Sequence, residues 1–519
     1  MSSALNKRCD VLIVGGGIAG SGIARDLALR GIDTILVEKD DFGSGTTGKS
    51  SRLIHGGLRY LEHLELGLVR EGLREREVLM DIAPNLVKPL RFVMPMYKDS
   101  KPGRSMLKAA MVVYDALSFD KSLTNHVFVS REETRDLLPF ISENGLKGAF
   151  VYYDAQAEMV ERLCLANVLD AEAHGASIYN HSAVSRLGVD GGKISSAKIE
   201  GLDGAFAVDA KIFINATGPW LDQFLAGIVG IGGNALTTTK GVHIITNGSA
   251  DSALVFNAGD GRPLFVIPWL GRLLIGTTDT MYEGSPDAVS AERDDISYIL
   301  SALKRYTPGI LAKELDVYAG LRPLVRKGGR SVSDISRNYR IIDHDSGSIG
   351  NLISVAGSKI TEYRSMSEKV GDLVAKKLGS RTRSSTSQLQ LPGSGEADAR
   401  PAHVAREEYS NLVRIYGSDA SKVIRAMEID GKLAARICNH NPDVLAEVYF
   451  SVKSEHARTV SDFMLRRSSL GYSACHGLDG LDKVAGLMGE LLHWDTTRME
   501  MEKGAYRDYI SLNAALRRT

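Results

Sequence analysis

The stretch CDVLIVGGGIAGSGIARDLALRGIDTILVEKDD, residues 9–41, decides the fold of this chain. Val11–Val14 is a continuous aliphatic run, as expected of a strand that is buried on both faces. A helical pattern, Ile18–Arg30, follows, and Gly31 ends it. Thr34–Val37 then predicts a second buried strand. These segments form a βαβ unit of about 30 residues, which is the opening of a doubly wound fold.

Three glycines stand at the turn between the first strand and the helix, in the pattern G-x-G-x-x-G. Gly15 permits the tight turn, Gly17 lets a pyrophosphate approach the backbone, and Gly20 lets helix and strand pack closely. The start of the helix offers amides and a positive dipole end to phosphate. Glu38, at the end of the second strand, is placed to accept hydrogen bonds from an adenosine ribose. The unit therefore predicts a dinucleotide site, and the acid at its end disfavours NADP.

The glycine pattern alone does not separate FAD from NAD, but the next segment favours FAD. FGSGTTGKSSRLIHGGLRYLEH, Phe42–His63, is rich in glycine and hydroxyl residues and leads into a helix. Such a loop is long enough to run beside a large extended cofactor. An ordinary flexible loop is the alternative interpretation of this segment.

The composition is ordinary for a soluble globular protein, with 44% hydrophobic and 24% charged residues among 519. Basic and acidic residues are balanced at 63 each, so no overall charge points to nucleic acid. The sequence has no secretory signal pattern and no apolar stretch long enough to span a bilayer, so we expect a cytoplasmic location. The cysteines form no CxxC pair, which argues against a disulfide framework and a metal site; they are Cys9, Cys164, Cys438 and Cys475.

Beyond the opening unit, strand and helix patterns alternate. The further strands that we expect are Ala183–Leu187, Ala210–Ile214, Leu264–Ile267, Leu273–Ile275 and Leu352–Val355, and the expected helices include Met159–Ala173 and Asp295–Tyr306. Residues 381–400 are polar and rich in Ser, Gly and Pro, which predicts a linker. The remainder has helical spacing, for example at Leu445–Val452 and Leu481–Leu492. We therefore expect a separate helical domain at the C-terminal end.

Seven motifs, in this order and spacing, resemble those of the FAD-dependent glycerol-3-phosphate dehydrogenases. They are SSRLIHGGLRYLEH (Ser50–His63), NATGPW (Asn215–Trp220), KGVHI (Lys240–Ile244), FVIPW (Phe265–Trp269), IGTTD (Ile275–Asp279), AGLRPL (Ala319–Leu324) and GSKITEYR (Gly357–Arg364). DFMLRRSSLG, Asp462–Gly471, is similar to the C-terminal domain of that family. The glycine turn and ATGPW are shared with other D-amino-acid-oxidase-like flavoproteins, whereas HGGLRYL and LRPL are the discriminating pieces.

The resemblance implies an α/β fold of the D-amino-acid-oxidase-like class. A Rossmann-like FAD-binding domain, about residues 1–85, 150–235 and 315–390, would be interleaved with a mixed-sheet substrate-capping domain, about residues 86–149 and 236–314. An all-α C-terminal domain would occupy residues 391–519.

The matching motifs also imply which residues contact FAD. The adenosine and phosphate end would meet Gly15, Gly17, Ile18, Ala19, Gly20, Glu38 and Lys39, with Ala183 and Val184 beside the adenine and Ala216, Thr217 and Gly218 beside the pyrophosphate. The middle and flavin end would meet Thr46, Thr47, Ser50, Ser51, Leu53, Ile54, His55 and Gly57, while Gly357, Ser358, Lys359 and Ile360 would close over the ring. Ser358 is a departure, because we expect glycine there, and it puts in doubt how closely this backbone approaches the flavin.

The implied reaction is oxidation of sn-glycerol 3-phosphate to dihydroxyacetone phosphate, in which a hydride passes from C2 to flavin N5. The protein must hold a phosphate dianion, which suits the planar guanidinium of arginine. The implied substrate-binding residues are Arg59, Tyr60, Arg337, Lys359 and Thr361. Surface salt bridging is the alternative role for these arginines.

The candidates for the catalytic base are His243 and His55, because a neutral imidazole can take a proton near neutral pH. We favour His243, with Arg322 close by to stabilise the developing alkoxide. His55 lies in the segment expected to contact FAD, where a hydrogen bond to the cofactor is the alternative role. A structural histidine is the alternative for His243.

The resemblance implies a quinone as electron acceptor, whereas a related oxidase would use oxygen. KPGRSMLKAAMVVYDALSF, Lys101–Phe119, is favoured as a core helix, with peripheral attachment to the cytoplasmic face of a membrane as the alternative. Two other functions stay open: a flavin oxidase or dehydrogenase of an amino or 2-hydroxy acid, and a flavin-dependent binding or sensor module. The sequence does not determine the oligomeric state.

Overall fold

The computed structural model of the chain describes residues 6–307, 315–326, 335–336, 338–346 and 349–514. The chain passes repeatedly between two compact units. Unit 1 comprises residues 1–48, 159–239 and 321–506, and unit 2 comprises residues 49–158, 240–320 and 507–519. Each unit is therefore assembled from stretches that are distant in sequence.

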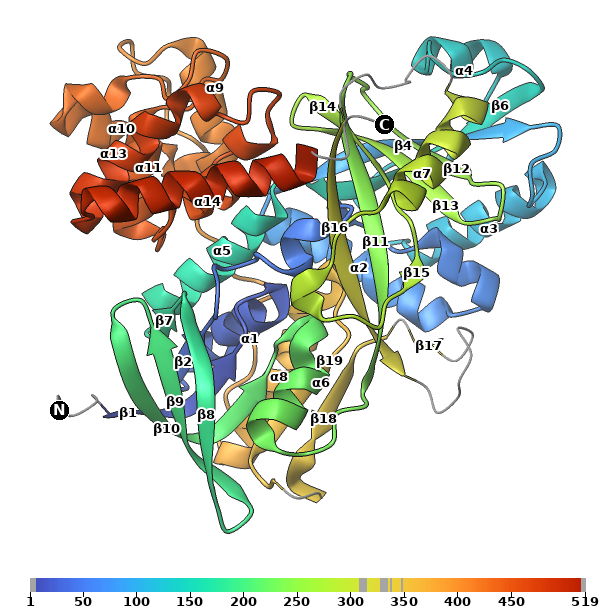
Figure 1. The fold of residues 1–519 in the computed structure, drawn as a ribbon. Helices are drawn as coiled ribbons and strands as arrows, with labels where there is room; N and C mark the ends of the chain where they lie inside the picture. The colour runs from blue at the N-terminus through green and yellow to red at the C-terminus, as the bar shows by residue number, and fades with distance from the viewer. Residues whose placement is uncertain (1–5, 308–314, 327–334, 337, 347–348, 515–519) are drawn as a thin grey trace. The chain divides into compact units, whose positions relative to one another are not determined.

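Unit 1 is organised around an eight-stranded sheet with the order β18-β19-β10-β1-β2-β7, to which the β8–β9 hairpin is joined through β9 and β10 (Figure 1). Its strands are β1 (Asn6–Val14), β2 (Thr34–Val37), β7 (Ser177–Tyr179), β8 (Ser182–Asp190), β9 (Lys193–Gly201), β10 (Gly204–Asn215), β18 (Arg340–Asp343) and β19 (Leu352–Ala356). The central strands from β19 to β7 run parallel. Val11, Leu12 and Ile13 are fully buried, as a parallel strand covered on both faces requires. The predicted βαβ opening is confirmed.

Helix α1 lies at the centre of the helices of unit 1 and packs against both α5 and α8. The helices beside the sheet are α1 (Ile18–Leu29), α5 (Val160–Ala173), α6 (Leu221–Phe224) and α8 (Tyr363–Leu378). The absence of a side chain at Gly22 permits this packing, because a Cβ there would lie 2.6 Å from Ser367 Oγ. Arg25 binds Asp170 of α5 at 2.6 Å in a buried ion pair. These contacts fix the helix that follows the glycine turn.

The predicted linker, residues 381–400, has neither helix nor strand but is hydrogen-bonded to α1. Arg25 donates to the carbonyl of Leu389 at 2.7 Å, and Arg30 donates to that of Thr382 at 2.8 Å. The segment is therefore an anchored part of unit 1 rather than a loose spacer.

The C-terminal part is helical, as predicted (Figure 1). Its helices are α9 (Arg406–Tyr416), α10 (Ala420–Ile429), α11 (Leu445–Ser454), α12 (Val460–Asp462), α13 (Leu481–Leu492) and α14 (Thr496–Ala514), and a further helical turn spans Phe463–Arg467. Val423, Val448 and Val484 are fully buried, so these helices enclose an apolar core of their own. The end of α14, from Arg507, belongs to unit 2.

Unit 2 holds most of a second, mixed sheet with the order β17-β16-β11-β14-β13-β12-β4-β6-β3, in which β15 pairs with β11 and β5 with β6. The strands are β3 (Leu53–Ile54), β4 (Val87–Tyr97), β5 (Val127–Val129), β6 (Leu146–Ala157), β11 (Leu236–Asn247), β12 (Ala253–Asn257), β13 (Pro263–Trp269), β14 (Arg272–Gly276), β15 (Thr280–Met281), β16 (Leu315–Arg326) and β17 (Ile335–Ser336). The helices are α2 (Leu66–Ile82), α3 (Arg104–Leu117), α4 (Arg131–Leu137) and α7 (Arg293–Tyr306). Val93, Ile244 and Val266 lie in its apolar core.

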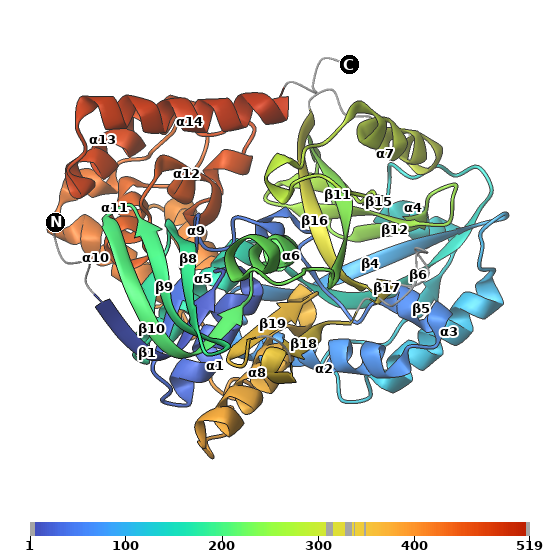
Figure 2. The ribbon, with the colours of Figure 1, turned by 60° about the horizontal axis from the view of Figure 1, so that its bottom comes forward.

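Helix α2 belongs to unit 2, whereas the sequence assigned residues up to about 85 to the cofactor domain. Leu73 and Leu79 are fully buried, and α2 packs against β4, β6 and α3 (Figure 2). The boundary in space therefore lies between Gly48 and Lys49. The sequence could not place it, because an amphipathic helix suits either domain.

Helix α3, which the sequence favoured as a core helix, contributes one face to the core of unit 2 and exposes the other. Leu107, Met111 and Tyr114 are buried on one face, whereas Met106 and Val112 are 67% and 53% exposed. Among the described residues, no helix combines the length and the apolar character that a bilayer crossing requires.

Candidate active site

The glycine turn of unit 1 has a geometry that side chains would block. Gly15 has a φ of +108°, and a Cβ on it would lie 2.6 Å from the carbonyl oxygen of Ala216. A Cβ on Gly20 would lie 1.8 Å from the oxygen of Gly15, so helix and strand approach each other only through glycine. The amide of Ala216 donates to the carbonyl of Val14 at 2.9 Å. The turn and Ala216 thus form the bare backbone cradle that a pyrophosphate requires.

Two side chains hold the amides of this turn. Glu38 is half-buried and accepts hydrogen bonds from the amides of Gly16 at 2.6 Å and Asp40 at 2.9 Å. Burial raises the pKa of the Glu38 carboxyl above its ordinary value. The hydroxyl of Thr47 accepts the amide of Ile18 at 3.0 Å. The first amide of the helix therefore donates to Thr47, whereas the sequence predicted that the amides at the start of the helix bind phosphate.

The predicted adenine-side residues lie next to the end of β2. The amide of Ser182 donates to the carbonyl of Glu38 at 2.6 Å, which brings the following Ala183 and Val184 close to Glu38. Lys39 has its ammonium 4.3 Å from the centre of the Trp220 ring. The structure therefore brings Glu38 and the start of β8, which were predicted from separate segments, next to each other, and their contact with adenosine stays a prediction.

The ATGPW motif turns away from β10 directly beside the glycine turn. Thr217 donates its hydroxyl to Asn215 Oδ1 at 2.7 Å, which fixes the turn. Gly218 has a φ of +57°, and a Cβ on it would meet no atom within 4 Å. Thr46, in the segment Phe42–His63, donates to the carbonyl of Leu321 at 2.7 Å.

The segment Gly357–Thr361, which was expected to close over the flavin, follows β19 in unit 1. Gly357 has a φ of +65°. Lys359 Nζ lies 3.0 Å from Glu362 Oε1, so its charge is shared with a buried acid. Ile360 is half-buried and Thr361 is buried. Ser358 Oγ is shielded from solvent and has no hydrogen-bond partner among the described residues. An orphaned hydroxyl at this place fits a bound group that would satisfy it.

His243 lies in β11 of unit 2 and is 2% exposed. Its Nε2 is 2.8 Å from Ser51 Oγ, and its ring centre is 5.1 Å from that of Tyr318. A Cβ on Gly276, its partner across the strands, would lie 2.6 Å from His243 Cδ2. The histidine therefore has a defined position and one predicted neighbour, Ser51.

Tyr318 connects this cluster to Ser50, in the segment Phe42–His63. Its hydroxyl donates to the carbonyl of Ser50 at 2.7 Å. The ammonium of Lys49 lies 5.6 Å from the centre of the Tyr318 ring and donates to the hydroxyl of Tyr509 near the end of α14. Ser50, Ser51 and His243 were predicted from the sequence; Lys49, Tyr318 and Tyr509 were not.

The HGG motif follows β3, whose residues Leu53 and Ile54 pair with β6. Gly57 has a φ of +74°, and a Cβ on it would lie 2.2 Å from the ring of Tyr60, so glycine is required beneath that ring. His55 is half-buried in the same turn. Arg59 lies on this turn too, and only its backbone is described.

The two remaining predicted arginines have different outcomes. Arg322 lies in the part of β16 that belongs to unit 1 and is half-buried. Its expected proximity to His243 stays a prediction. Arg337 lies outside the described residues.

A second charged residue of the region, in addition to Lys49, was also missed. Arg52 is 1% exposed, and its guanidinium lies 4.4 Å from the centre of the Trp269 ring. The indole of Trp269 donates to the carbonyl of Glu158 at 2.7 Å. Arg52 lies inside the SSRLIHGG motif, and Tyr318 directly precedes AGLRPL. Both residues could therefore have been identified as candidates from these motifs.

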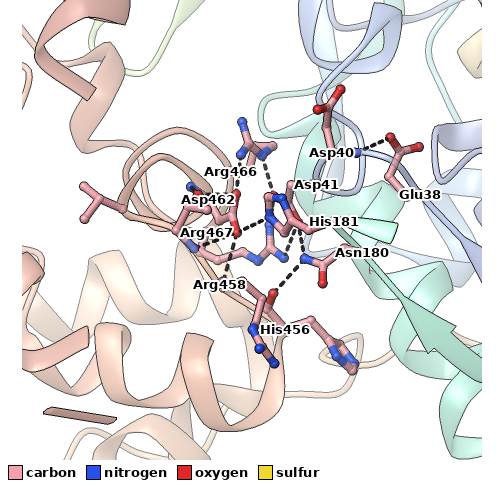
Figure 3. Close-up of polar contacts among 12 residues, drawn as sticks. Glu38, Asp40, Asp41, Asn180, His181, His456, Arg458, Asp462, Arg466 and Arg467 are labelled. Atoms are coloured by element: carbon pink, nitrogen blue, oxygen red, sulfur yellow. Dashed lines mark hydrogen bonds and ion pairs between the residues drawn. The ribbon is translucent and has the colours of Figure 1, made fainter. Parts of the chain in front are cut away.

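Two groups of potential metal ligands occur among the described residues. One brings Cys438 and Cys475 near Asp479, although the cysteines are distant in sequence. In the other, Asp41 and Asp462 stand beside His181, and arginines bind both carboxylates (Figure 3).

Comparisons with known proteins match this architecture over nearly the whole chain. The family described as FAD dependent oxidoreductase matches residues 10–360, and the C-terminal domain of alpha-glycerophosphate oxidase matches residues 384–499. A glycerol-3-phosphate dehydrogenase of Synechocystis sp. is 37% identical over 98% of this chain and 97% of its own length. An aerobic glycerol-3-phosphate dehydrogenase of Staphylococcus epidermidis is 31% identical over 95% and 92%.

A solved structure agrees with the sequence relatives. The glycerol-3-phosphate dehydrogenase of Bacillus halodurans, complexed with FAD, superimposes with a TM-score of 0.77 at 25% identity, covering 98% of this chain and 95% of that one. The cradle in unit 1 fits the cofactor of that family. By fold, motifs and full-length similarity, the chain belongs to the FAD-dependent glycerol-3-phosphate dehydrogenases.

Proposed function

We propose that this protein oxidises sn-glycerol 3-phosphate to dihydroxyacetone phosphate and passes the electrons to a quinone. The observation that carries the proposal is the buried His243 cluster, in a chain 37% identical to a glycerol-3-phosphate dehydrogenase. FAD, when bound, would accept two electrons together with the hydrogen that leaves C2. The protein must orient the alcohol, take the hydroxyl proton and hold the phosphate.

His243 is the proposed base for the hydroxyl proton. The contacts with Ser51 and Tyr318 fix the orientation of its ring, and a pre-oriented acceptor avoids reorganisation when substrate binds. Arg322 is proposed to stabilise the negative charge that develops on the alcohol oxygen. His55 is the alternative base.

The phosphate is proposed to bind to Arg59, Tyr60, Arg337, Lys359 and Thr361. Lys359 is the weakest of the cations, because phosphate would compete with Glu362 for its ammonium. A guanidinium can donate two parallel hydrogen bonds to phosphate, which favours Arg59 over Lys359.

Anaerobic titration of the purified flavoprotein tests this function. Glycerol 3-phosphate should bleach the oxidised flavin absorbance completely. Bleaching only by an amino acid or a 2-hydroxy acid would replace the proposal with the alternative enzyme. Flavin that none of these compounds reduces would favour a binding or sensor module.

Oxygen is the second candidate for electron acceptor, because the match over residues 384–499 is to a domain of an oxidase. After anaerobic reduction by substrate, a soluble quinone should reoxidise the flavin much faster than air does. Faster reoxidation by air would assign the protein as an oxidase.

We also propose that the protein is cytoplasmic and attaches peripherally to the cytoplasmic face of the membrane through α3. Val113 and Phe119 are 40% and 79% exposed, in addition to Met106 and Val112. The exposed cations Lys101, Arg104 and Lys108 accompany them. An apolar exposed face with basic residues suits a surface of anionic lipid, where a quinone would be within reach.

Vesicle pelleting tests the attachment. A Lys101→Ala/Arg104→Ala/Lys108→Ala variant should bind anionic vesicles less than wild type does. The matched control is Arg131→Ala/Arg135→Ala/Lys147→Ala, which removes the same charge from other exposed positions of unit 2. Equal loss in both variants, or no loss in either, would exclude α3 as the attachment site.

A further inference from the structure

The segment Glu38–Gly43 connects the ribose-binding acid to the glycine turn. Glu38 accepts the amide of Gly16, and the amide of Gly43 donates to the carbonyl of Gly16 at 3.1 Å. Phe42 is 1% exposed and lies against the same glycine, since a Cβ on Gly16 would be 2.6 Å from its ring. The position of this segment therefore sets the position of the cradle.

Asp41, in the middle of this segment, is bound by the helical C-terminal domain (Figure 3). Its carboxylate is buried and accepts hydrogen bonds from both terminal nitrogens of Arg467 and from Nε of Arg466. The bond from Arg467 to Oδ1 measures 2.9 Å. Asn180 also donates to Oδ1 at 3.0 Å. Burial opposes ionisation of Asp41, but the charges of Arg467 and Arg466 outweigh it, so the pKa of this carboxyl lies below its ordinary value.

The two arginines are themselves held in place. Arg467 donates to the carbonyl of Glu455 at 2.7 Å, and Arg466 donates to Asp462 at 2.7 Å. Asp462 is fully buried and also binds His181 at 2.9 Å. Every charge of the network has an opposite partner, so its geometry is specific.

A second contact joins the same surfaces. Asn180 donates to the carbonyl of His456 at 2.8 Å, and the ring of His456 meets that of Phe42 edge to face at 6.2 Å. The amide of His181 donates to the carbonyl of Asp40 at 2.6 Å. The segment Glu38–Gly43 is therefore held both by hydrogen bonds and by the aromatic contact of Phe42 with His456.

We propose that the helical C-terminal domain is a working part of the FAD site, in which Arg467 and Arg466 position Asp41 and thereby hold Glu38 in the conformation that binds the adenosine ribose. Asp41, Arg466 and Arg467 are positioning residues that do not touch the cofactor. The inference rests on the proposed role of Glu38, and the same experiment tests that role separately.

The test is FAD retention by the full-length holoenzyme, followed through the rise of flavin fluorescence on dilution, together with the equilibrium Kd. Asp41→Asn keeps the shape of the side chain and removes its charge. Asp41→Asn removes the carboxylate that pairs with Arg467 and one of the two that bind Arg466. Because a buried guanidinium is then left without its full counter-charge, we expect a Kd about tenfold or more above wild type. Glu502→Gln is the matched control, since Glu502 is a buried acid of α14 that binds Arg498 at 2.9 Å and the amide of Val460 at 3.1 Å, and its hydrogen bonds among the described residues do not include Glu38–Gly43.

A cycle with Glu38→Gln separates positioning from general destabilisation. If Asp41 acts through Glu38, the double variant should retain FAD no worse than Glu38→Gln alone. An Asp41→Asn effect that is additive to that of Glu38→Gln, or is matched by Glu502→Gln, would overturn the inference. Unchanged FAD affinity in Glu38→Gln would instead refute the ribose role of Glu38. If Asp41→Asn does not fold, Arg467→Lys, which keeps the charge and loses the paired donors, should give the same ordering.

Discussion

Ser51 Oγ lies 2.8 Å from Nε2 of His243, inside a strand environment that leaves the histidine 2% exposed. If His243 is the base, His243→Gln should slow flavin reduction by glycerol 3-phosphate by about 10²- to 10⁴-fold. Ser51→Ala removes the hydrogen bond to the ring, and at full FAD content we expect a loss of about tenfold. Anaerobic stopped-flow absorbance measures both rates. Equal rates in wild type and His243→Gln, at full FAD content, would exclude the base role and direct attention to His55.

Gly276 is required by the ring of His243. A Cβ at this position would lie 2.6 Å from Cδ2 of the histidine and 2.9 Å from the carbonyl oxygen of Val242. Gly276→Ala should therefore lower stability by about 1–3 kcal/mol and also reduce the rate of flavin reduction. Gly259→Ala is the control, because a Cβ there meets no atom within 4 Å. Thermal unfolding and stopped-flow reduction should both separate the two variants; identical behaviour would refute the packing argument.

The parts of the fold that the sequence predicted are those encoded locally. The β1–α1–β2 unit follows from an aliphatic run, a glycine turn and helical spacing within residues 9–41, and all three elements stand where expected. The C-terminal helices were likewise visible as amphipathic spacing. The role of residues 381–400 was not, because its anchors Arg25 and Arg30 lie more than 350 residues earlier, as the contact of Arg30 with Thr382 illustrates.

The sequence predicted the candidate site residues that lie inside recognisable motifs. It missed the contacts that form between segments distant in sequence. His243 and Ser51 came from separate motifs, and the structure brings them into contact. The contact of Lys49 with Tyr509 joins residues 460 positions apart, and no local pattern in either segment indicates the other. The bond between Asp41 and Arg467 spans 426 positions, so it too depends on the tertiary fold.

The buried hydroxyl of Ser358 predicts an effect on the flavin itself. Its Oγ has no partner among the described residues, and a donor to the ring would stabilise the electron-rich reduced form. Ser358→Gly should therefore lower the two-electron midpoint potential by about 20 mV, the equivalent of one hydrogen bond of about 1 kcal/mol. Spectroelectrochemical titration measures the shift. An unchanged potential and an unchanged visible spectrum would show that the hydroxyl does not reach the ring.

The ion pair between His181 and Asp462 predicts a pH-dependent stability. Burial lowers the pKa of His181, but the hydrogen bond and charge of Asp462 outweigh it, so the folded-state pKa is raised. The stabilisation is therefore complete below the unfolded value of about 6.5 and is lost as the pH rises through the higher folded value. The difference in melting temperature between wild type and His181→Gln should be largest in mild acid and should shrink toward alkaline pH. A difference that is constant or grows with pH would contradict this assignment.

The most direct measurement is anaerobic mixing of the full-length flavoprotein with glycerol 3-phosphate and, in parallel, with the same compound carrying deuterium at C2. We predict that both reduce the flavin to the end point reached with dithionite, and that the deuterated compound does so several-fold more slowly because the C2–H bond breaks in that step. Flavin that stays oxidised in the presence of glycerol 3-phosphate would contradict the proposed function. Equal rates of reduction by the two compounds, together with an unchanged rate in His243→Gln, would contradict the proposed chemistry.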